Sequence, residues 1–129
     1  MTLAVLDASA LLALLLEEPG ADRVRAVITD AAMSTVNLAE VVGYLARKGT
    51  TEADIRTMTD DIRVALVPFD EGLAYATGLY LPTTRPAGLS LGDRACLALA
   101  ERLAVRAQTT DRSWSRVAAA IGVEVELIR

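Results

Sequence analysis

The chain has 129 residues, 53% hydrophobic and 23% charged, which favours one packed domain over residues 1–129 and excludes intrinsic disorder. Its net charge of −4 argues against nonspecific binding of nucleic acid, and its lack of histidine excludes triads with a histidine base and most zinc sites. The single cysteine excludes an internal disulfide, and no apolar run approaches the roughly 18 residues that span a bilayer, so we expect a cytoplasmic protein outside the membrane.

The first half of the sequence alternates short apolar runs with stretches of helical periodicity. Ser9 opens the first helix, and Thr35 or Asn37 is expected to cap the third helix. In chain order, the pattern predicts a strand at 3–6, helices at 9–16 and 22–28, a strand at 32–34 and a helix that ends at 47.

The second half continues this alternation and ends in a strand. Thr51 followed by Asp54 resembles a capping box, and Ser90 is expected to cap a later helix. Two prolines and two threonines at residues 81–87 predict a loop. In chain order, we predict a helix at about 51–62, a strand at 64–67, a helix at 71–80, the loop at 81–87, a helix at 91–103, a strand at 105–109, a helix at 113–120 and a strand at 123–128.

Helices that alternate with short strands predict an α/β fold, in which a mostly parallel central sheet carries helices on both faces. In sheets of this kind, ligands bind beyond the carboxyl ends of the strands. Polar residues that directly follow strands are therefore the best candidates for a functional site.

Four acidic residues are candidates for this site, two because they follow strands and two because they lie in helices with apolar residues around them. Asp7 and Asp111 each follow a strand, and Asp93 lies in the first turn of a helix. Glu40 has apolar neighbours on both sides, which favours a buried position that needs a partner such as a metal ion. Structural alternatives stay open, because aspartates cap helices well, the helix dipole favours an acid at Asp93, and a single glutamate can occupy a narrow polar stripe.

Carboxylate ligands without histidine or cysteine suit hard cations, Mg²⁺ or Mn²⁺. Two such ions would neutralise the net charge of −4 and would support hydrolysis of a phosphodiester, with one ion activating a water and the other stabilising the leaving oxygen. Ser9 and Thr110 are placed to hold a water or a phosphate oxygen, although helix capping suits Ser9 better. Cys96 lies in an apolar stretch and is expected to be buried rather than nucleophilic.

Four segments, taken together, resemble the PIN-domain family and in particular the VapC-type toxins. They are Val-Leu-Asp-Ala-Ser at 5–9, Asn-Leu-Ala-Glu-Val at 37–41, Leu-Ser-Leu-Gly-Asp at 89–93 and Thr-Asp-Arg-Ser-Trp at 110–114. None of these motifs is specific by itself, but the ordered set is, and it covers essentially the whole chain.

This resemblance implies a single PIN-like nuclease domain, an α/β/α sandwich that cleaves RNA endonucleolytically with Mg²⁺ or Mn²⁺. The family's acidic quartet corresponds to Asp7, Glu40, Asp93 and Asp111. Its neighbouring polar residues correspond to Ser9 and Thr110, and Arg112 stands where a substrate phosphate would lie.

The resemblance also implies partners: an RNA substrate such as tRNA or rRNA, a second copy of the chain in a homodimer, and a VapB-like antitoxin. A basic antitoxin side chain placed among the acids would compete with the metal for the same negative charge. Apolar residues near the N-terminus would supply a groove for a partner helix or simply belong to the core. They are Leu11, Leu12, Leu15 and Leu16.

Other classes of protein also place aspartates at strand ends. Receiver domains and haloacid-dehalogenase-like phosphatases need a lysine after a later strand, but Lys48 is the only lysine and ends an earlier helix. A catalytically silent module that binds a protein or nucleic acid remains the main alternative, although all four acids are present. Nucleases that act on DNA or flap structures tend to carry extra segments and basic surfaces.

Overall fold

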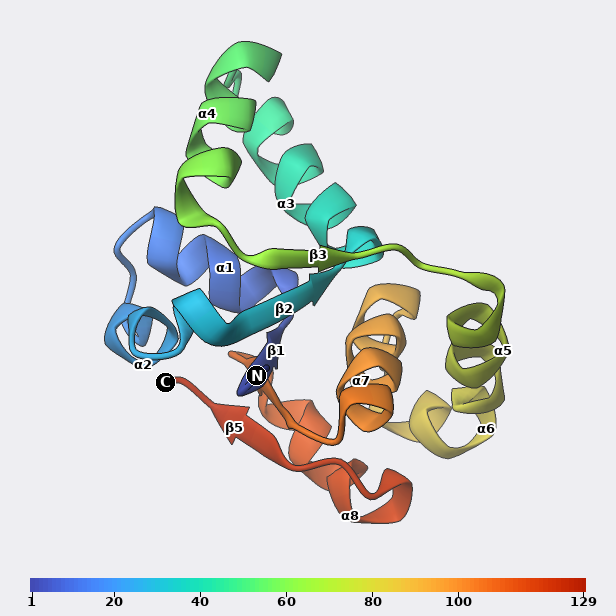
Figure 1. The fold of residues 1–129 in the computed structure, drawn as a ribbon. Coiled ribbons are helices and arrows are strands. Elements are labelled where there is room, and N and C mark those ends of the chain that lie inside the picture. The colour runs from blue at the N-terminus through green and yellow to red at the C-terminus, as the bar shows by residue number, and fades with distance from the viewer.

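Five short parallel strands form the central sheet of the computed structural model, which describes residues 1–129. They are Ala4–Leu6 (β1), Ala31–Ser34 (β2), Ala65–Val67 (β3), Arg106–Thr109 (β4) and Val125–Leu127 (β5). The strand order β3-β2-β1-β4-β5 places β1 at the centre, between β2 and β4 (Figure 1). The predicted parallel α/β architecture is thus confirmed.

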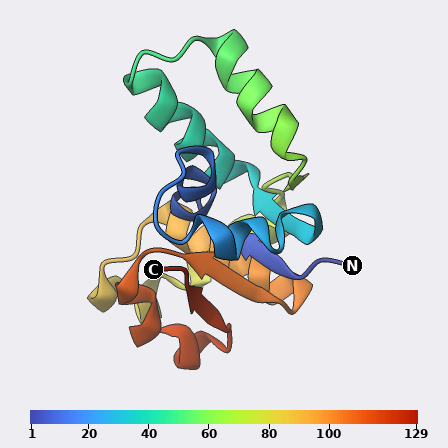
Figure 2. The same cartoon turned by 90° about the vertical axis from the view of Figure 1, so that its left-hand side faces the viewer.

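Helices cover both faces of this sheet and complete three layers. They are Ala8–Leu15 (α1), Ala21–Arg25 (α2), Thr35–Arg47 (α3), Glu52–Ile62 (α4), Glu71–Leu79 (α5), Leu81–Thr84 (α6), Leu91–Leu103 (α7) and Ala118–Ile121 (α8). Figures 1 and 2 show α1 and α2 on one face, α7 with α5 on the other, and α3 with α4 as a hairpin projecting beyond the sheet. No helix combines the length and apolar character that crossing a membrane requires.

The pleat of the strands divides the core into two clusters of buried side chains. Val5 belongs to the cluster beneath α7, which also contains Leu97 and Trp114. Its neighbour Leu6 points the other way and packs with Leu11 and other residues of the α1 and α3 side. Alternate residues of a strand face opposite sides of a sheet, so the central strands β1 and β2 supply both cores.

Two predicted segments differ from the structure. Residues 81–87, predicted as a loop, form α6 and the 3₁₀ helix η2 (Arg85–Ala87), because both prolines lie in the first two positions of their helices, where the missing N–H is not needed. The single helix predicted at 113–120 is instead the 3₁₀ helix η3 (Arg112–Arg116) followed by α8. Residues 28–30 likewise form a separate 3₁₀ helix, η1 (Ile28–Asp30).

The helix caps were predicted in part. Thr51 and Ser90 cap α4 and α7 as expected, each by accepting a hydrogen bond from a backbone N–H three residues later. The cap of α3 is Ser34 rather than Thr35 or Asn37, since the Ser34 hydroxyl accepts from the Val36 N–H. Asn37 is therefore free for a different role.

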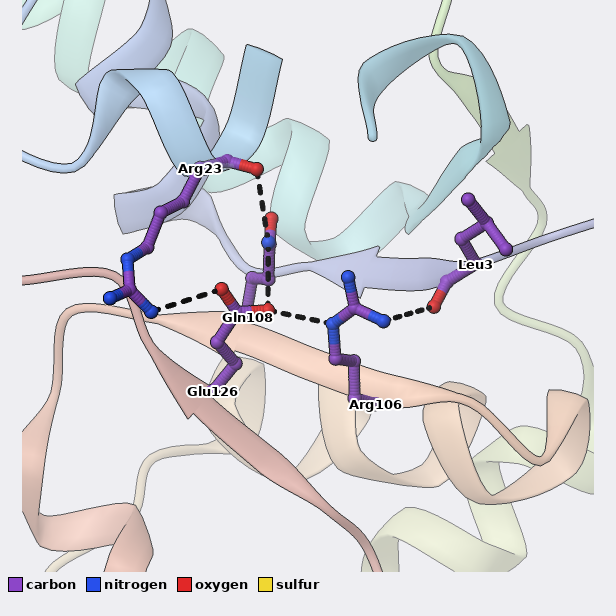
Figure 3. Close-up of polar contacts among 5 residues, drawn as sticks. All are labelled: Leu3, Arg23, Arg106, Gln108 and Glu126. Atoms are coloured by element: carbon purple, nitrogen blue, oxygen red, sulfur yellow. Dashed lines mark hydrogen bonds and ion pairs between the residues drawn. The ribbon is translucent and has the colours of Figure 1, made fainter. Parts of the chain in front are cut away.

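A polar network fastens the last strand to the sheet and to α2 (Figure 3). The Glu126 carboxylate accepts hydrogen bonds from Arg106 Nε at 2.6 Å and from Gln108 Nε2 at 3.1 Å, and it also pairs with Arg23 Nη1 at 3.5 Å. Gln108 Nε2 additionally donates to the Arg23 carbonyl oxygen, and Arg106 donates to the Leu3 carbonyl oxygen. One carboxylate thus joins α2, β4 and β5.

We expect Glu126→Ala to lower the free energy of unfolding by about 1–3 kcal/mol, because Gln108 and Arg106 would lose a half-buried acceptor. Glu124→Ala, at an exposed neighbouring position with no ion pair, is the matched control. Urea denaturation of both variants at pH 7 measures the difference. Equal stability of the two would show that the network contributes little.

The same network predicts a pH dependence. Burial raises the pKa of Glu126, but hydrogen bonds from Gln108 and Arg106 outweigh burial and leave this pKa below its usual 4.5. The contribution of Glu126 should therefore be complete above pH 4.5 and be lost as the pH falls through the folded-state pKa. The stability gap between wild type and Glu126→Ala should narrow over that acidic range.

Candidate active site

The candidate site lies at the carboxyl end of the central strands, as expected for a parallel sheet. Asp7 follows β1 directly, and Asp111 lies two residues beyond the end of β4, the strand that pairs with β1. The first turns of α3 and α7 meet at the same edge, where Asn37 of α3 donates a hydrogen bond to the Gly92 carbonyl oxygen of α7. These four elements carry the predicted acids from distant parts of the sequence to one edge of the sheet, where Asp93 lies near enough to Asp7 and to Asp111 for their charges to interact.

Asp7 is the most buried of the four acids, with only 5% of its surface exposed. Its Oδ1 accepts hydrogen bonds from Ser9 Oγ at 2.7 Å and from the Ala10 N–H at 2.8 Å. Its Oδ2 accepts from Thr109 Oγ1 at 2.6 Å. Asp7 thus caps α1, as the structural alternative expected, while Oδ2 keeps a lone pair for another ligand.

Burial raises the pKa of Asp7 from 3.8 to about 6, because the ionised carboxylate loses contact with water. Hydrogen bonds from Ser9, Thr109 and Ala10 oppose this shift, and the negative charge of Asp93 adds to it. No arginine or lysine pairs with Asp7. The ionised form of Asp7 therefore lacks a positive partner within the protein.

Asp93 and Asp111 lie nearer the surface and repel each other. Burial raises the pKa of Asp93, and the charge of Asp111 contributes to this rise despite hydrogen bonds from Ser90. Asp93 closes the capping box of α7 by accepting from the Ser90 N–H at 2.9 Å. Asp111 is exposed and caps η3, where its Oδ1 accepts from the Ser113 N–H and hydroxyl. Both acids therefore combine a capping role with a place in the acidic cluster.

Glu40 contradicts one expectation, since the structure places it on the exposed side of α3. The buried stripe of this helix consists of Asn37, Val41 and Leu45, and Val42 beside it is also exposed. Apolar neighbours in sequence did not bury Glu40 because α3 projects beyond the sheet and packs along only one narrow face. Its carboxylate nevertheless turns toward α7, held by a hydrogen bond from Asn37 Nδ2 at 2.8 Å.

The polar residues of the site differ in part from those predicted. Ser9 is not a helix cap; its hydroxyl donates to Asp7 and accepts from the Thr110 N–H at 3.0 Å. The Thr110 side chain makes no hydrogen bond with the protein, and its neighbour Thr109, which sequence reasoning missed, bridges two acids. Thr109 Oγ1 donates to Asp7 Oδ2 and accepts from the Asp111 N–H at 3.0 Å. A threonine at the end of a buried strand was the available signal.

Cys96 is buried and Arg112 is exposed, and both lie close in sequence to an acid of the site. Cys96 is fully buried, as predicted, and burial together with the charges of Asp7, Asp93 and Glu40 holds its thiol pKa well above the usual value. A protonated thiol is a poor nucleophile and a poor metal ligand. Arg112 begins η3 beside Asp111, is exposed and forms no ion pair, so its guanidinium is available to solvent.

The donor set fits a hard divalent cation. Asp7, Asp93, Asp111 and Glu40 offer only oxygen ligands, and none of them takes part in the six ion pairs of the structure. No three acidic side chains lie close enough together to form a preassembled metal site. The three surface concavities, with volumes of about 460, 390 and 310 Å³, are lined by none of the four acids. The four acids therefore lie at one edge of the sheet without an ion pair and outside any pronounced concavity.

Comparison with solved structures supports the fold. The chain resembles a chain of the DNA-bound VapBC complex from Salmonella typhimurium at TM-score 0.76 and 17% identity, covering 98% of both chains. It resembles VapBC2 from Rickettsia felis at TM-score 0.73 and 15% identity, covering 97% of this chain and 98% of that one. It resembles the sarcin-ricin loop cleaving toxin VapC20 from Mycobacterium tuberculosis at TM-score 0.70 and 18% identity, covering 90% and 94%. Identities this low establish the fold alone.

The fold and the site define an α/β protein that gathers carboxylates at the carboxyl edge of a parallel sheet. The sequence model of the PIN domain matches residues 4–120, and the chain belongs to the PIN-domain family. Comparison with curated protein sequences gives no significant match.

Proposed function

We propose that this PIN-domain protein is a Mg²⁺- or Mn²⁺-dependent endoribonuclease and the toxin of a type II toxin-antitoxin pair. The observation that carries the proposal is the position of Asp7, Asp93 and Asp111 at the carboxyl edge of the sheet, where none of the three forms an ion pair. Burial raises the pKa of Asp7 and of Asp93, and the charge of a neighbouring acid adds to each rise. A buried carboxylate such as Asp7 needs a compensating partner when it is ionised, and acids with raised pKa values cluster at functional sites. A hard cation that also binds phosphate would be such a partner.

Each acid would hold the cation from a different element. Asp7 offers Oδ2 from the end of β1, Asp93 lies in the first turn of α7, Asp111 follows β4, and Glu40 reaches across from α3. The bound cation would activate a water for attack on a phosphodiester and stabilise the leaving oxygen. Arg112, exposed beside Asp111, would contact a phosphate of the RNA, and Thr110 would contact a water or a phosphate oxygen.

The neutral form of Asp7 would compete with cation binding. Because its pKa is about 6 without metal, a fraction of the protein carries a proton on Asp7 near neutral pH. Ser9 and Thr109 favour the ionised form by donating hydrogen bonds to both carboxylate oxygens. These two hydroxyls thus prepare Asp7 for the cation and fix its orientation.

We propose a VapB-like antitoxin and a second copy of the chain as protein partners. The structural neighbours include VapBC structures from three organisms and FitAB bound to DNA, which supports an antitoxin for this chain. On α1, Leu11 belongs to the core, whereas Leu12 and Leu15 are half-buried and Leu16 is exposed. Leu12 and Leu15 pack in part on the core, and together with the exposed Leu16 they would offer their remaining apolar surface to an antitoxin helix.

Cleavage of RNA by the purified chain tests the proposal. We expect a panel of structured RNAs, including total tRNA and rRNA fragments, to be cut with Mn²⁺ or Mg²⁺ and left intact with EDTA. Asp22→Asn, an acid with a 98% exposed side chain on α2, should cut like the wild type and serve as the charge control. Folded protein that cuts no RNA with either metal would favour the silent binding module instead.

A further inference from the structure

The only asparagine of the chain, Asn37, links the two helices that carry Glu40 and Asp93. It is completely buried, and its Nδ2 donates one hydrogen bond to Glu40 Oε1 at 2.8 Å and one to the Gly92 carbonyl oxygen at 3.0 Å. Both hydrogens of the amide are thereby used. An aspartate here would have no hydrogen to donate and would face a carboxylate and a carbonyl oxygen, so an amide is required.

Gly92 provides the space into which the Glu40 carboxylate fits. A Cβ built at Gly92 would overlap the carboxylate carbon and both oxygens of Glu40. The backbone of Gly92 has no positive φ, so its conformation does not require glycine. A glycine in the first turn of a helix weakens that helix relative to alanine. The reason for a glycine at this position is therefore the neighbouring carboxylate.

We infer that Asn37 and Gly92 are positioning residues that hold the Glu40 carboxylate against the first turn of α7, the turn that carries Asp93, in readiness for the cation; this inference rests on the proposed function. Glu40 is an exposed side chain with several rotatable bonds, and a free glutamate would lose conformational entropy when it bound a metal. Asn37 restricts the carboxylate from one side, and the missing side chain of Gly92 lets it approach α7. Partners that orient a metal ligand in this way typically change metal affinity 10- to 100-fold.

Gly92→Ala tests the space beside α7. We expect about 10- to 100-fold weaker Mn²⁺ binding, measured by isothermal titration calorimetry of the full chain, because the new methyl group displaces the Glu40 carboxylate. Gly43→Ala is the matched control, since Gly43 also lies within a helix and a Cβ there meets no atom within 4 Å. Its Mn²⁺ affinity should equal that of the wild type.

Asn37→Ala tests the hydrogen bond from Asn37 to Glu40. The same substitution in a Glu40→Ala background separates an effect on the position of Glu40 from a general loss of stability. We expect Asn37→Ala to weaken Mn²⁺ binding in the wild-type background, with no further loss from either variant once Glu40 is alanine. Without metal, Gly92→Ala should raise the melting temperature more in the Glu40→Ala background than in the wild type, because the methyl group then has room. A merely structural role would give the same changes in both backgrounds.

The outcomes separate the inference from the proposed function. Wild-type protein that binds Mn²⁺, together with Gly92→Ala and Asn37→Ala proteins of unchanged affinity, would overturn the inference and leave the nuclease proposal standing. Wild-type protein that binds neither Mn²⁺ nor Mg²⁺ would overturn both. The positioning role is supported if both substitutions weaken Mn²⁺ binding in the wild-type background and neither weakens it further in the Glu40→Ala background.

Discussion

We expect Asp7→Asn to abolish the proposed RNA cleavage and, without metal, to make the folded chain more stable at neutral pH. Asp7 is the most buried acid of the site, and its raised pKa means that the ionised form is held at a cost to the folded state. In the proposed site the substitution would remove a cation ligand, for which we expect more than about a 100-fold loss of activity. Gain of stability with loss of activity would mark Asp7 as a functional rather than a structural acid.

The stability change has a defined sign and pH range. The folded-state pKa of Asp7, about 6, lies above its usual 3.8, so the native chain binds more protons than the unfolded chain between these values. The free energy of unfolding should therefore fall as the pH rises from about 4 to about 6, and the full penalty of about 3 kcal/mol remains above that range. The amide introduced by Asp7→Asn also has one acceptor fewer for Ser9 or Thr109, so we expect a net gain of about 1–3 kcal/mol.

Urea denaturation of wild type and Asp7→Asn between pH 4 and 7.5, in EDTA, measures this difference. The gap should grow between pH 4 and 6 and then stay constant, whereas Asp22→Asn should follow the wild type throughout. Added Mn²⁺ should stabilise only the wild type, because ligand binding to the native state raises its stability. An Asp7→Asn protein that cleaves RNA at the wild-type rate would contradict the assignment of Asp7 to the site.

The alternation of helices and strands could be predicted from sequence because short apolar runs, such as those of the central strands β1 and β2, separate stretches of helical periodicity, as strands buried on both faces require. The same alternation placed Asp7 and Asp111 beyond strands of the sheet. The strand order could not be predicted, since it depends on which apolar faces pack together. The segment 81–87 was misjudged because proline both interrupts helices and starts them, and only its position within the turn decides.

The contacts among the site residues were harder to predict than their identities. Sequence neighbours suggested a buried Glu40, but burial depends on how α3 packs, and the helix offers its partners only the stripe of Asn37, Val41 and Leu45. To decide whether Thr109 or Thr110 contacts Asp7, the exact end of β4 must be known. Successive side chains of a strand point in opposite directions, so an error of one residue selects the wrong threonine. The sequence pattern thus identified the four acids, whereas the residues that orient them could be identified only from the contacts in the structure.

Thr109→Val should lower activity by about 10- to 100-fold and the free energy of unfolding by about 1–3 kcal/mol. Valine keeps the shape of threonine but removes the hydroxyl that donates to Asp7 Oδ2 and accepts from the Asp111 N–H. Asp7 would lose one of the hydrogen bonds that favour its ionised form, and the Asp111 N–H would lose its acceptor. Single-turnover cleavage, Mn²⁺ titration and urea denaturation measure the three effects.

Thr77→Val is the matched control for this substitution. Thr77 of α5 is as fully buried as Thr109, but its hydroxyl has no hydrogen-bond partner, so valine should leave stability unchanged or slightly improved. Activity and Mn²⁺ affinity should also stay at the wild-type level. If the two valine variants give the same results in all three measurements, the Thr109 hydroxyl that links Asp7 and Asp111 does not contribute to activity. If only Thr109→Val loses activity and binds Mn²⁺ more weakly, the Thr109 hydroxyl aligns Asp7 and Asp111, two acids that follow separate strands.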